Sequence, residues 1–233
     1  MNNIKVICFD ADDTLWVNEP YYREIEGQFA GLLRDYIDEK SCNDILLQTE
    51  INNLGLYGYG AKSFVLSMIE TAIKISNYQI DNRTIEEILI LGRGLINKPL
   101  QLLDGVKDVL SHFHGKYRLI LATKGDLLDQ ERKLKKSGLE TFFHHIEIMS
   151  EKDVSNYKKL IQHLDVLPEE FVMVGNSVKS DILPVLKIGA YAIHIPCETT
   201  WAHEHVVNSE LQNARFREVE SLINIKDIIP SFK

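Results

Sequence analysis

After Pro99 the sequence alternates between short apolar runs and amphipathic segments, and this alternation constrains the fold most. The apolar runs cover residues 117–123, 144–150, 171–177 and 191–196 and predict buried strands. The segments between them repeat apolar residues every three or four positions and predict helices. Such alternation is typical of parallel strands joined by right-handed crossovers. With a further apolar run at 4–9, we expect an α/β fold with a Rossmann-like parallel sheet and helices on both faces.

Two aspartates mark expected helix starts in this region. Asp104 precedes the amphipathic segment 106–114, and Asp126 precedes a second one that ends before Gly138. An aspartate at the N-cap accepts hydrogen bonds from free backbone N–H groups, and glycine is typical just after a helix. We therefore predict that Asp104 and Asp126 each cap a helix.

Residues 17–97 follow a different pattern and predict a helical insertion. Amphipathic segments cover 21–37, 63–75 and 84–96, and no strand pattern interrupts them. We expect an α/β core domain made of 1–16 and 98–233, with a helical cap domain at 17–97. The glycine-rich stretch 54–64 predicts a turn between cap helices. It is no phosphate loop, because Ala61 separates Gly60 from its lysine.

Composition excludes several functional classes. The chain has 233 residues and a net charge of −8, which disfavours binding to nucleic acid or to an anionic membrane surface. Its three cysteines are widely spaced and predict neither disulfides nor a zinc site. No run approaches the roughly 20 apolar residues of a membrane-spanning helix, and we expect a cytoplasmic protein. An anionic ligand would require local or metallic positive charge.

Polar side chains gather where three of the expected strands end. Asp10 and Asp12 follow the first strand, Thr123 ends the second, and Asn176 and Asp181 follow the strand at 171–175. Ligands of open parallel sheets bind beyond the carboxyl ends of the strands, so we expect these residues to lie together. The crowding of carboxylates there predicts a cation, because like charges repel and desolvate at a cost.

Four segments together resemble the signature of the haloacid dehalogenase-like hydrolase superfamily. They read DADDT, LILATKGD, SEKD and VMVGNSVKSDI, in the order of that family. The helical insertion also falls where the family carries its cap. The resemblance covers the whole predicted core, and it implies a core of this family with a helical cap.

The resemblance implies catalytic roles for three residues. Asp10 would be the nucleophile that attacks phosphorus, and Asp12 would be the general acid and then the base. Lys152 would neutralise the charge of the nucleophile and of the phosphoryl group. Lys158 and Lys159 are rivals for that position, although they lie within a predicted helix and are more typical of a solvated face.

The same resemblance implies ligands for phosphate and for Mg²⁺. Thr123 and the backbone N–H groups of Lys124 and Gly125 would hold phosphate oxygens. The residues expected to bind Mg²⁺ are Asp10, Asp12 through its carbonyl oxygen, Asn176 and Asp181, the last through water.

Two positions depart from the family pattern. The fourth motif begins Gly175-Asn176 where an aspartate is usual, so one negative charge is lost and we expect weaker Mg²⁺ binding. Lys152 is followed by Asp153 instead of the common proline.

Further residues are candidates for contacts with substrate. Tyr57, Tyr59 and Lys62 occupy the glycine-rich turn of the predicted cap, where a packing role is equally expected. Trp16 follows the first motif and either lines the entrance or packs between cap and core.

Two charged segments predict no site. The segment ERKLKK at 131–136 is typical of a solvated helix face. The segment WAHEH, with His203 and His205, lacks metal-ligand spacing and predicts a surface loop.

Asp12 distinguishes among the reactions of this family. An alkoxide leaving group requires a proton, whereas halide leaves without one, so Asp12 favours phosphoester hydrolysis over dehalogenation. We predict a Mg²⁺-dependent phosphatase that hydrolyses a small phosphorylated metabolite through an aspartyl-phosphate. A phosphomutase with the same residues is the alternative, as is a catalytically weak member that binds a phosphorylated ligand or a protein. The natural substrate and the oligomeric state are not predicted.

Overall fold

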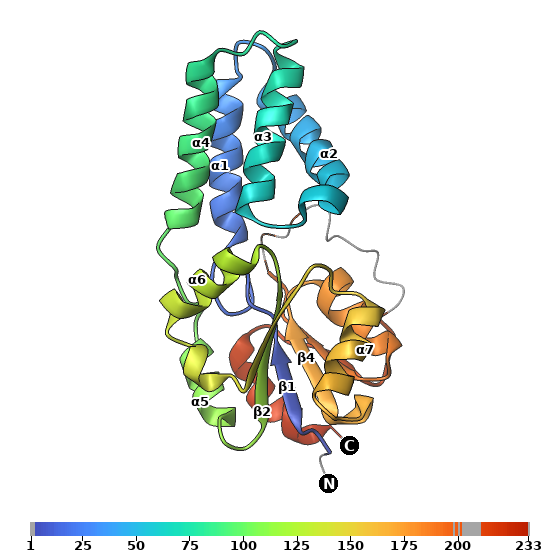
Figure 1. The fold of residues 1–233 in the computed structure, drawn as a ribbon. Helices are drawn as coiled ribbons and strands as arrows, with labels where there is room; N and C mark the ends of the chain where they lie inside the picture. The colour runs from blue at the N-terminus through green and yellow to red at the C-terminus, as the bar shows by residue number, and fades with distance from the viewer. Residues whose placement is uncertain (1–2, 198, 200, 202–210, 233) are drawn as a thin grey trace. The chain divides into compact units, whose positions relative to one another are not determined.

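The computed structural model describes residues 3–197, 199, 201 and 211–232. Contacts within the chain divide it into two units (Figure 1). The first, the sheet unit, consists of Met1–Val17, Leu100–Lys124 and Glu131–Lys233, and the second, the helical unit, consists of Asn18–Pro99 and Gly125–Gln130.

The sheet unit is built on parallel strands. Among the described residues, six strands form one sheet in the order β3-β2-β1-β4-β5-β6, and every neighbouring pair is parallel. The strands are β1 (Val6–Phe9), β2 (Arg118–Lys124), β3 (His145–Met149), β4 (Phe171–Gly175), β5 (Tyr191–His194) and β6 (Phe216–Glu218). The predicted α/β fold is confirmed. Strand β6 is not predicted from the sequence, because it is short and its side chains are not buried.

The register of the three central strands brings their carboxyl ends together. Phe9 at the end of β1 pairs with Leu121 of β2 on one side and with Val174 of β4 on the other. Asp10 therefore emerges from the sheet between the last residues of β2 and β4. Polar side chains that follow these strands are brought to one edge of the sheet, as the sequence predicts.

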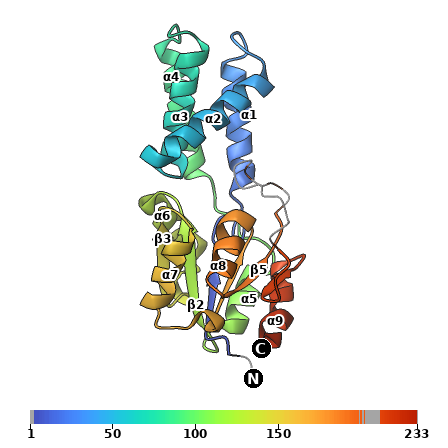
Figure 2. The ribbon, with the colours of Figure 1, turned by 90° about the vertical axis from the view of Figure 1, so that its right-hand side faces the viewer.

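Helices cover both faces of this sheet (Figure 2). On one face, Ile7 and Phe9 of β1 belong to an apolar cluster that includes residues of α5 (Val106–Phe113) and α9 (Ile225–Ile228). On the other face, Val6 and Cys8 belong to a second cluster with α7 (Val154–His163) and α8 (Leu183–Lys187). Burial of both faces explains why the central strands β1 and β4 are apolar throughout instead of alternating.

The remaining helical elements of the sheet unit are short or shared between the units. They are α6 (Leu127–Ser137), 3-10 turns at Glu140–Phe142, Pro168–Glu170, Leu222–Asn224 and Ile229–Ser231, and a π-helical turn at Val178–Ile182. Asp126 caps α6 as predicted, because its carboxylate accepts a hydrogen bond from the N–H of Asp129 at 3.1 Å. The predicted cap at Asp104 is wrong. Gly105 precedes α5 with a φ of +78°, a left-handed conformation that glycine tolerates, and no side chain caps this helix.

The helical unit contains four helices, and residues 18–99, all of them described, form no strand. The helices are α1 (Glu19–Leu32), α2 (Glu39–Tyr57), α3 (Ala61–Ile75) and α4 (Asn82–Asn97). Helix α2 was not predicted as a separate element. It includes Leu54–Tyr57, which were assigned to a glycine-rich turn, and the turn itself is confined to Gly58–Gly60.

A group of charged side chains lies on α1 and α2 of the helical unit, with Glu19 and Glu26 buried and Arg23 exposed. The guanidinium of Arg23 lies 3.1 Å from the carboxylate of Glu19 and 2.9 Å from that of Glu26. Burial and the nearby carboxylates of Glu26 and Glu19 raise the pKa of Glu50 to about 8, and Arg23 opposes this shift. Glu50 is therefore mainly protonated at neutral pH.

None of the helices in the described part of the chain is both long enough and apolar enough to span a membrane.

Candidate active site

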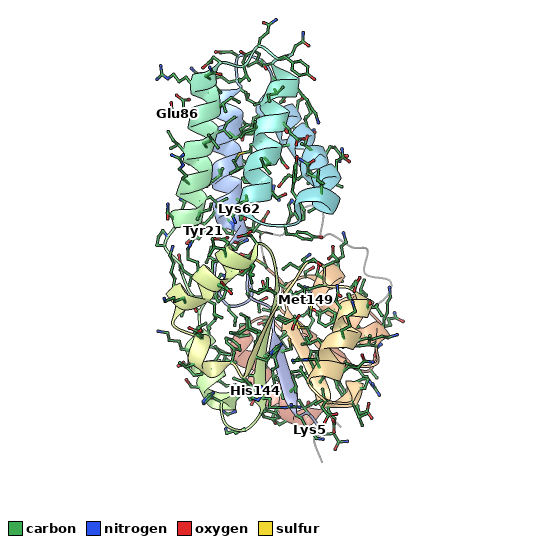
Figure 3. All side chains as sticks on the ribbon, viewed as in Figure 1. Lys5, Tyr21, Lys62, Glu86, His144 and Met149 are labelled. Carbon is green, nitrogen blue, oxygen red and sulfur yellow. The ribbon has the colours of Figure 1, made fainter. Side chains whose placement is uncertain are left out.

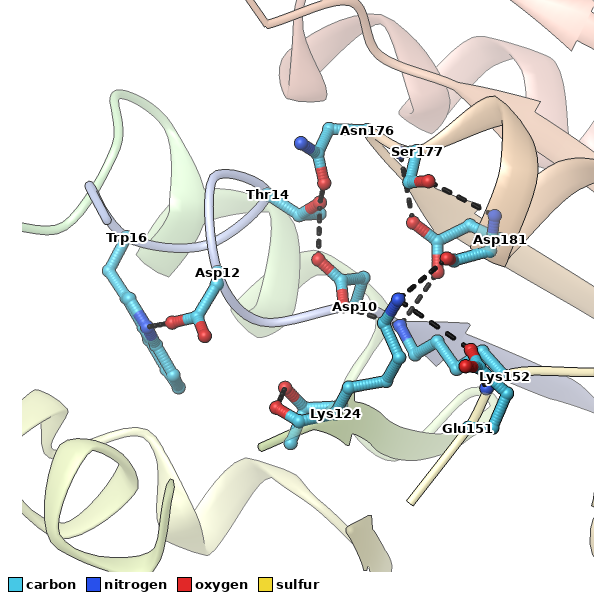
Figure 4. A network of polar contacts seen from close by, with 12 residues as sticks. Asp10, Asp12, Thr14, Trp16, Lys124, Glu151, Lys152, Asn176, Ser177 and Asp181 are labelled. Carbon is cyan, nitrogen blue, oxygen red and sulfur yellow. Dashed lines mark hydrogen bonds and ion pairs between the residues drawn. The ribbon is translucent and has the colours of Figure 1, made fainter. Parts of the chain in front are cut away.

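Lys152 joins two carboxylates at the carboxyl edge of the sheet (Figure 4). Its Nζ lies 2.5 Å from Oδ1 of Asp10 and 2.6 Å from Oδ1 of Asp181. Lys152 is only 3% exposed, and Asp181 is fully buried. A buried ammonium between two carboxylates is stabilised only by such pairing. The structure therefore brings Asp10, Lys152 and Asp181 together, whereas Lys158 and Lys159 are exposed on α7.

The position of Asp181 depends on the backbone that follows β4. Its Oδ2 accepts a hydrogen bond from the N–H of Ser177 at 3.0 Å. The hydroxyl of Ser177 in turn accepts from the N–H of Ser180 at 3.0 Å, which closes the π-helical turn. Asp181 also packs against Gly175, where a Cβ atom would lie 2.3 Å from Oδ2. A side chain larger than hydrogen at position 175 would displace this carboxylate.

A second group of contacts surrounds the other oxygen of Asp10. The hydroxyl of Thr14 donates to Asp10 Oδ2 at 3.0 Å, as Figure 4 shows. This bond ties Thr14, in the turn that follows β1, to the carboxylate of Asp10. The amide group of Asn176 faces the same oxygen. In one orientation its Oδ1 accepts a hydrogen bond from the Thr14 hydroxyl at 3.2 Å, and in the other its nitrogen takes that place, 3.3 Å from Asp10 Oδ2 and 3.2 Å from the carbonyl oxygen of Asp12. The side chain of Asn176, one carboxylate oxygen of Asp10 and the carbonyl of Asp12 thus converge on one point.

The chemistry of these donors fits Mg²⁺. An amide oxygen, a carboxylate and a backbone carbonyl are the hard oxygen ligands that this ion accepts, and it retains water at its other positions. Among the described residues, no three side chains of His, Cys, Asp or Glu form a metal cluster. The groups that converge here would therefore offer a cation one carboxylate and two neutral oxygen atoms. The metal role predicted for Asp181 stays a prediction, since Lys152 and Ser177 engage both of its oxygens.

For Asp10 and for Lys152, burial and the oppositely charged partner shift the pKa in opposite directions. Burial, together with the carboxylates of Asp181 and Asp12, raises the pKa of Asp10 to about 7, while Lys152 opposes the shift. Burial disfavours the charged form of Lys152, but Asp10 and Asp181 outweigh it and raise the pKa of Lys152 above its usual value. Lys152 thus remains an ammonium, and additional positive charge near Asp10 would favour its ionised, nucleophilic form.

Asp12 points away from Asp10 toward a different pair of partners. The indole N–H of Trp16 donates to Asp12 Oδ1 at 2.7 Å, and the ammonium of Lys133 lies 2.9 Å from the same oxygen. The segment 131–136 was predicted to be a solvated helix face, and for Lys133 this is wrong. Its side chain is 21% exposed and faces inward from α6, because the register of the helix directs it to Asp12.

The residues expected to hold phosphate lie at the end of β2 and directly after it. Thr123 is buried, and its hydroxyl donates to the carbonyl of Lys124 at 3.3 Å. The ammonium of Lys124 donates to Ser180 Oγ at 2.8 Å and lies 3.7 Å from the carboxylate of Glu151. Gly125 follows with a φ of +133°, which favours glycine. The phosphate-binding role of these residues stays a prediction.

The other candidates for substrate contacts are divided between the two units. Tyr57, Tyr59 and Lys62 belong to the helical unit, at the end of α2, in the turn and in the first turn of α3, where Lys62 is exposed (Figure 3). Trp16 is 1% exposed and packs in an apolar cluster of the sheet unit, and its contact with substrate stays a prediction. The segment with His203 and His205 lies outside the described residues.

Two residues that the sequence analysis did not connect with the site lie behind Asn176. His194, at the end of β5, has Nε2 3.0 Å from the backbone oxygen of Asn176 and Nδ1 2.8 Å from Glu218 Oε2. These contacts hold the backbone of Asn176 from the neighbouring strand. The alternation of His194 with Ile193 and Ile195 predicts its place in or beside the sheet, but no local signal predicts this contact.

Comparisons with known proteins agree with these findings. The model of the haloacid dehalogenase-like hydrolase family matches residues 4–189. A glyceraldehyde 3-phosphate phosphatase of Methanothermobacter thermautotrophicus is 30% identical over 242 residues, which cover 95% of this chain and 99% of that protein.

Solved structures show the same architecture. A haloacid dehalogenase-like family hydrolase from Xanthomonas campestris is 37% identical, with a TM-score of 0.88 over 99% of this chain and 92% of that one. The structure of YfnB from Bacillus subtilis bound to magnesium has a TM-score of 0.66 at 18% identity, over 97% of this chain and 98% of that one. The resemblance of the four motifs is confirmed, and the chain belongs to the haloacid dehalogenase-like hydrolase family.

Proposed function

We propose that this hydrolase is a Mg²⁺-dependent phosphatase that acts on a small phosphorylated metabolite through an aspartyl-phosphate. One observation carries the proposal: two carboxylates two residues apart have different surroundings. Asp10 is buried against Lys152, and Asp12 lies against Trp16 and Lys133. Carboxyl groups in different environments can take different roles, here nucleophile and acid–base.

In the first half of the reaction, a carboxylate oxygen of Asp10 attacks the phosphorus of the ester. The bond between phosphorus and the leaving oxygen breaks, and the protonated carboxyl of Asp12 gives its proton to that oxygen. The products are an alcohol and a phosphorylated Asp10. Lys152 lies 2.5 Å from Asp10 and offsets the charge that gathers there.

In the second half, Asp12 is ionised and takes a proton from water. The resulting hydroxide oxygen attacks phosphorus, the bond from phosphorus to Asp10 breaks, and inorganic phosphate leaves. Thr14 donates to Asp10 and helps to restore the carboxylate to its starting orientation. Lys152 would serve in both halves, since its ammonium position does not depend on substrate.

Asp10, the carbonyl of Asp12 and Asn176 are the residues that would hold Mg²⁺. When bound, the ion supplies positive charge that lets an acidic site accept an anionic phosphate. The relatives support this assignment, since one is a glyceraldehyde 3-phosphate phosphatase and the YfnB structure is bound to magnesium.

The test is an assay of the purified chain with p-nitrophenyl phosphate and a panel of phosphometabolites, with Mg²⁺ and with EDTA. We expect turnover that EDTA abolishes and that Asp10→Asn lowers by several orders of magnitude. The phosphorylated aspartate should appear in acid-quenched wild type as an additional mass on the peptide that contains Asp10. Turnover that survives in Asp10→Asn would contradict the proposed nucleophile.

The same panel separates the alternatives. Transfer of labelled phosphate between two sugar phosphates, without release of inorganic phosphate, would indicate a mutase. Absence of turnover over the whole panel, together with tight binding of a phosphorylated ligand, would indicate a binding protein.

A further inference from the structure

We propose that Lys133 is a positioning residue for the acid–base carboxylate, holding Asp12 against Trp16 so that it can serve the leaving group. The inference rests on the proposed function, because it takes Asp12 as the acid. It assigns a role in the reaction to a lysine on a helix surface that the four family motifs do not include.

Two hydrogen-bond donors, Trp16 and Lys133, hold Asp12, and we call this pair the clamp. Trp16 Nε1 and Lys133 Nζ lie 2.7 and 2.9 Å from the same oxygen, Oδ1 of Asp12. The side chain of an aspartate has two torsion angles, and two donors from different segments of the chain restrict both. A general acid must lie within hydrogen-bond distance of the atom that it protonates, so its orientation affects the rate directly.

Both parts of the clamp are fixed by packing. Trp16 is 1% exposed and belongs to the apolar cluster under β1. Leu134, the neighbour of Lys133, is 4% exposed and belongs to the same cluster, which anchors α6 in that rotation. The register of the helix thus presents Lys133 to Asp12, while Lys135 and Lys136 are exposed. Because packing in the core fixes the rotation of α6, Lys133 is preorganised beside Asp12 and does not depend on random rotation of its long side chain.

The positive charge of lysine makes it a better partner for Asp12 than a neutral hydrogen-bond donor would be. The contact is an ion pair whose two side chains are only 21% and 22% exposed, so solvent screens it less than a surface pair. A neutral side chain of similar size would keep the packing of α6 but would lose the ammonium that donates to Oδ1 of Asp12, both in the ionised carboxylate and when Oδ2 carries the proton.

The experiment compares two esters that differ in their need for an acid. p-Nitrophenolate leaves readily without a proton, whereas the more basic phenolate of phenyl phosphate depends on one. We expect Lys133→Met to lower kcat/KM for phenyl phosphate about tenfold or more, part of the ~10²–10⁴ that general acid catalysis contributes, with less than about a twofold loss for p-nitrophenyl phosphate. Lys133→Arg should restore most of the loss.

A second measurement does not depend on activity. The chain has two tryptophans, so the indole N–H resonance of Trp16 can be assigned with Trp16→Phe. Because this N–H donates to Asp12, its NMR signal should shift in Lys133→Met. Lys136→Met, which removes an exposed charge from the same helix, is the matched control and should change neither the signal nor either rate.

The outcomes separate the inference from the proposed function. An equal loss for both esters, or no loss for either, overturns the inference in an active phosphatase. If the wild type hydrolyses neither ester nor any phosphometabolite, the proposed function fails. The Trp16 resonance then decides alone, and an unshifted signal in Lys133→Met overturns the positioning of Asp12 by Lys133.

Discussion

The carboxylate of Asp181 lies so close to the Cα of Gly175 that a Cβ atom there would meet Oδ2 at 2.3 Å. The glycine at the end of β4 therefore has a steric role. It leaves room for the buried carboxylate that binds Lys152, and Lys152 in turn binds Asp10. The position of the proposed nucleophile thus depends on the absence of a side chain at residue 175.

Gly175→Ala tests this dependence. The new methyl group should displace Asp181 and then Lys152, and a misplacement of about 1 Å is expected to lower kcat/KM by about 10²-fold. Activity toward p-nitrophenyl phosphate and the melting temperature should both be measured. Gly27→Ala, on α1 with no heavy atom within 4 Å of the new Cβ, is the control and should stay active. Wild-type activity in Gly175→Ala would contradict the steric role.

Asn176→Asp should strengthen the binding of Mg²⁺. The change adds a negative charge to a set that now contains one carboxylate and two neutral groups, and a tenfold tighter Kd would correspond to about 1.4 kcal/mol. The measurement is the rise of the melting temperature with MgCl₂ concentration in the absence of substrate.

The control is Asn82→Asp, which adds the same charge at an exposed position of the helical unit. It should leave the Mg²⁺ dependence unchanged. Binding by Asn176→Asp that is equal to or weaker than that of the wild type would exclude Asn176 from the metal site.

Glu50 should make the stability of the folded chain depend on pH. Its pKa rises from the ordinary 4.5 to about 8 on folding, so between these values the folded state holds a proton that the unfolded state has lost. Stability therefore falls as pH rises through this range, with a slope of at most about 1.4 kcal/mol per pH unit. Glu50→Gln removes this contribution and should be the more stable protein at pH 8, with a smaller difference at pH 5.

Urea unfolding at pH 5, 6, 7 and 8 measures the effect. Glu86 lies on the exposed side of α4 (Figure 3), and Glu86→Gln is the matched control, whose difference from wild type should not change with pH in this way. A constant difference between Glu50→Gln and wild type would show that Glu50 is not held protonated.

Two glycines of α4 should respond to alanine with opposite signs. A Cβ at Gly92 would lie 2.1 Å from Val65 Cγ2 of α3, and such overpacking typically costs about 1–3 kcal/mol. A Cβ at Gly94 has no heavy atom within 4 Å, and alanine in an exposed helix is favoured over glycine by about 0.5–1 kcal/mol. Gly92→Ala should therefore lower the free energy of unfolding and Gly94→Ala should raise it. Equal effects would contradict close packing of α4 on α3.

The parts of the site that follow strands could be predicted from the sequence. Asp10 and Asn176 come directly after buried apolar runs, and parallel pairing of those runs brings their ends together. Lys152 was also predicted, through the motif that follows the strand at 144–150. In these cases a local pattern and a general rule of sheet topology are sufficient.

Other contacts depend on tertiary packing, which the local sequence pattern does not predict. Lys133 has the sequence environment of a surface lysine, and only the rotation of α6, set by Leu134, brings it to Asp12. Helix α2 was missed because it buries Cys42, Leu46 and Thr49, a pattern with little apolar contrast. His194 reaches Asn176 only because β5 lies beside β4.

The buried ammonium of Lys152 has a consequence for the order of assembly. In small metal-dependent domains the ion is often the counter-charge that lets acidic ligands leave water, and folding then waits for the ion. Here the ammonium of Lys152, which belongs to the chain itself, pairs with the two buried carboxylates of Asp10 and Asp181 and offsets part of their charge. We therefore expect the chain to fold without divalent ions, and the proposed Mg²⁺ to bind to a scaffold that is already folded.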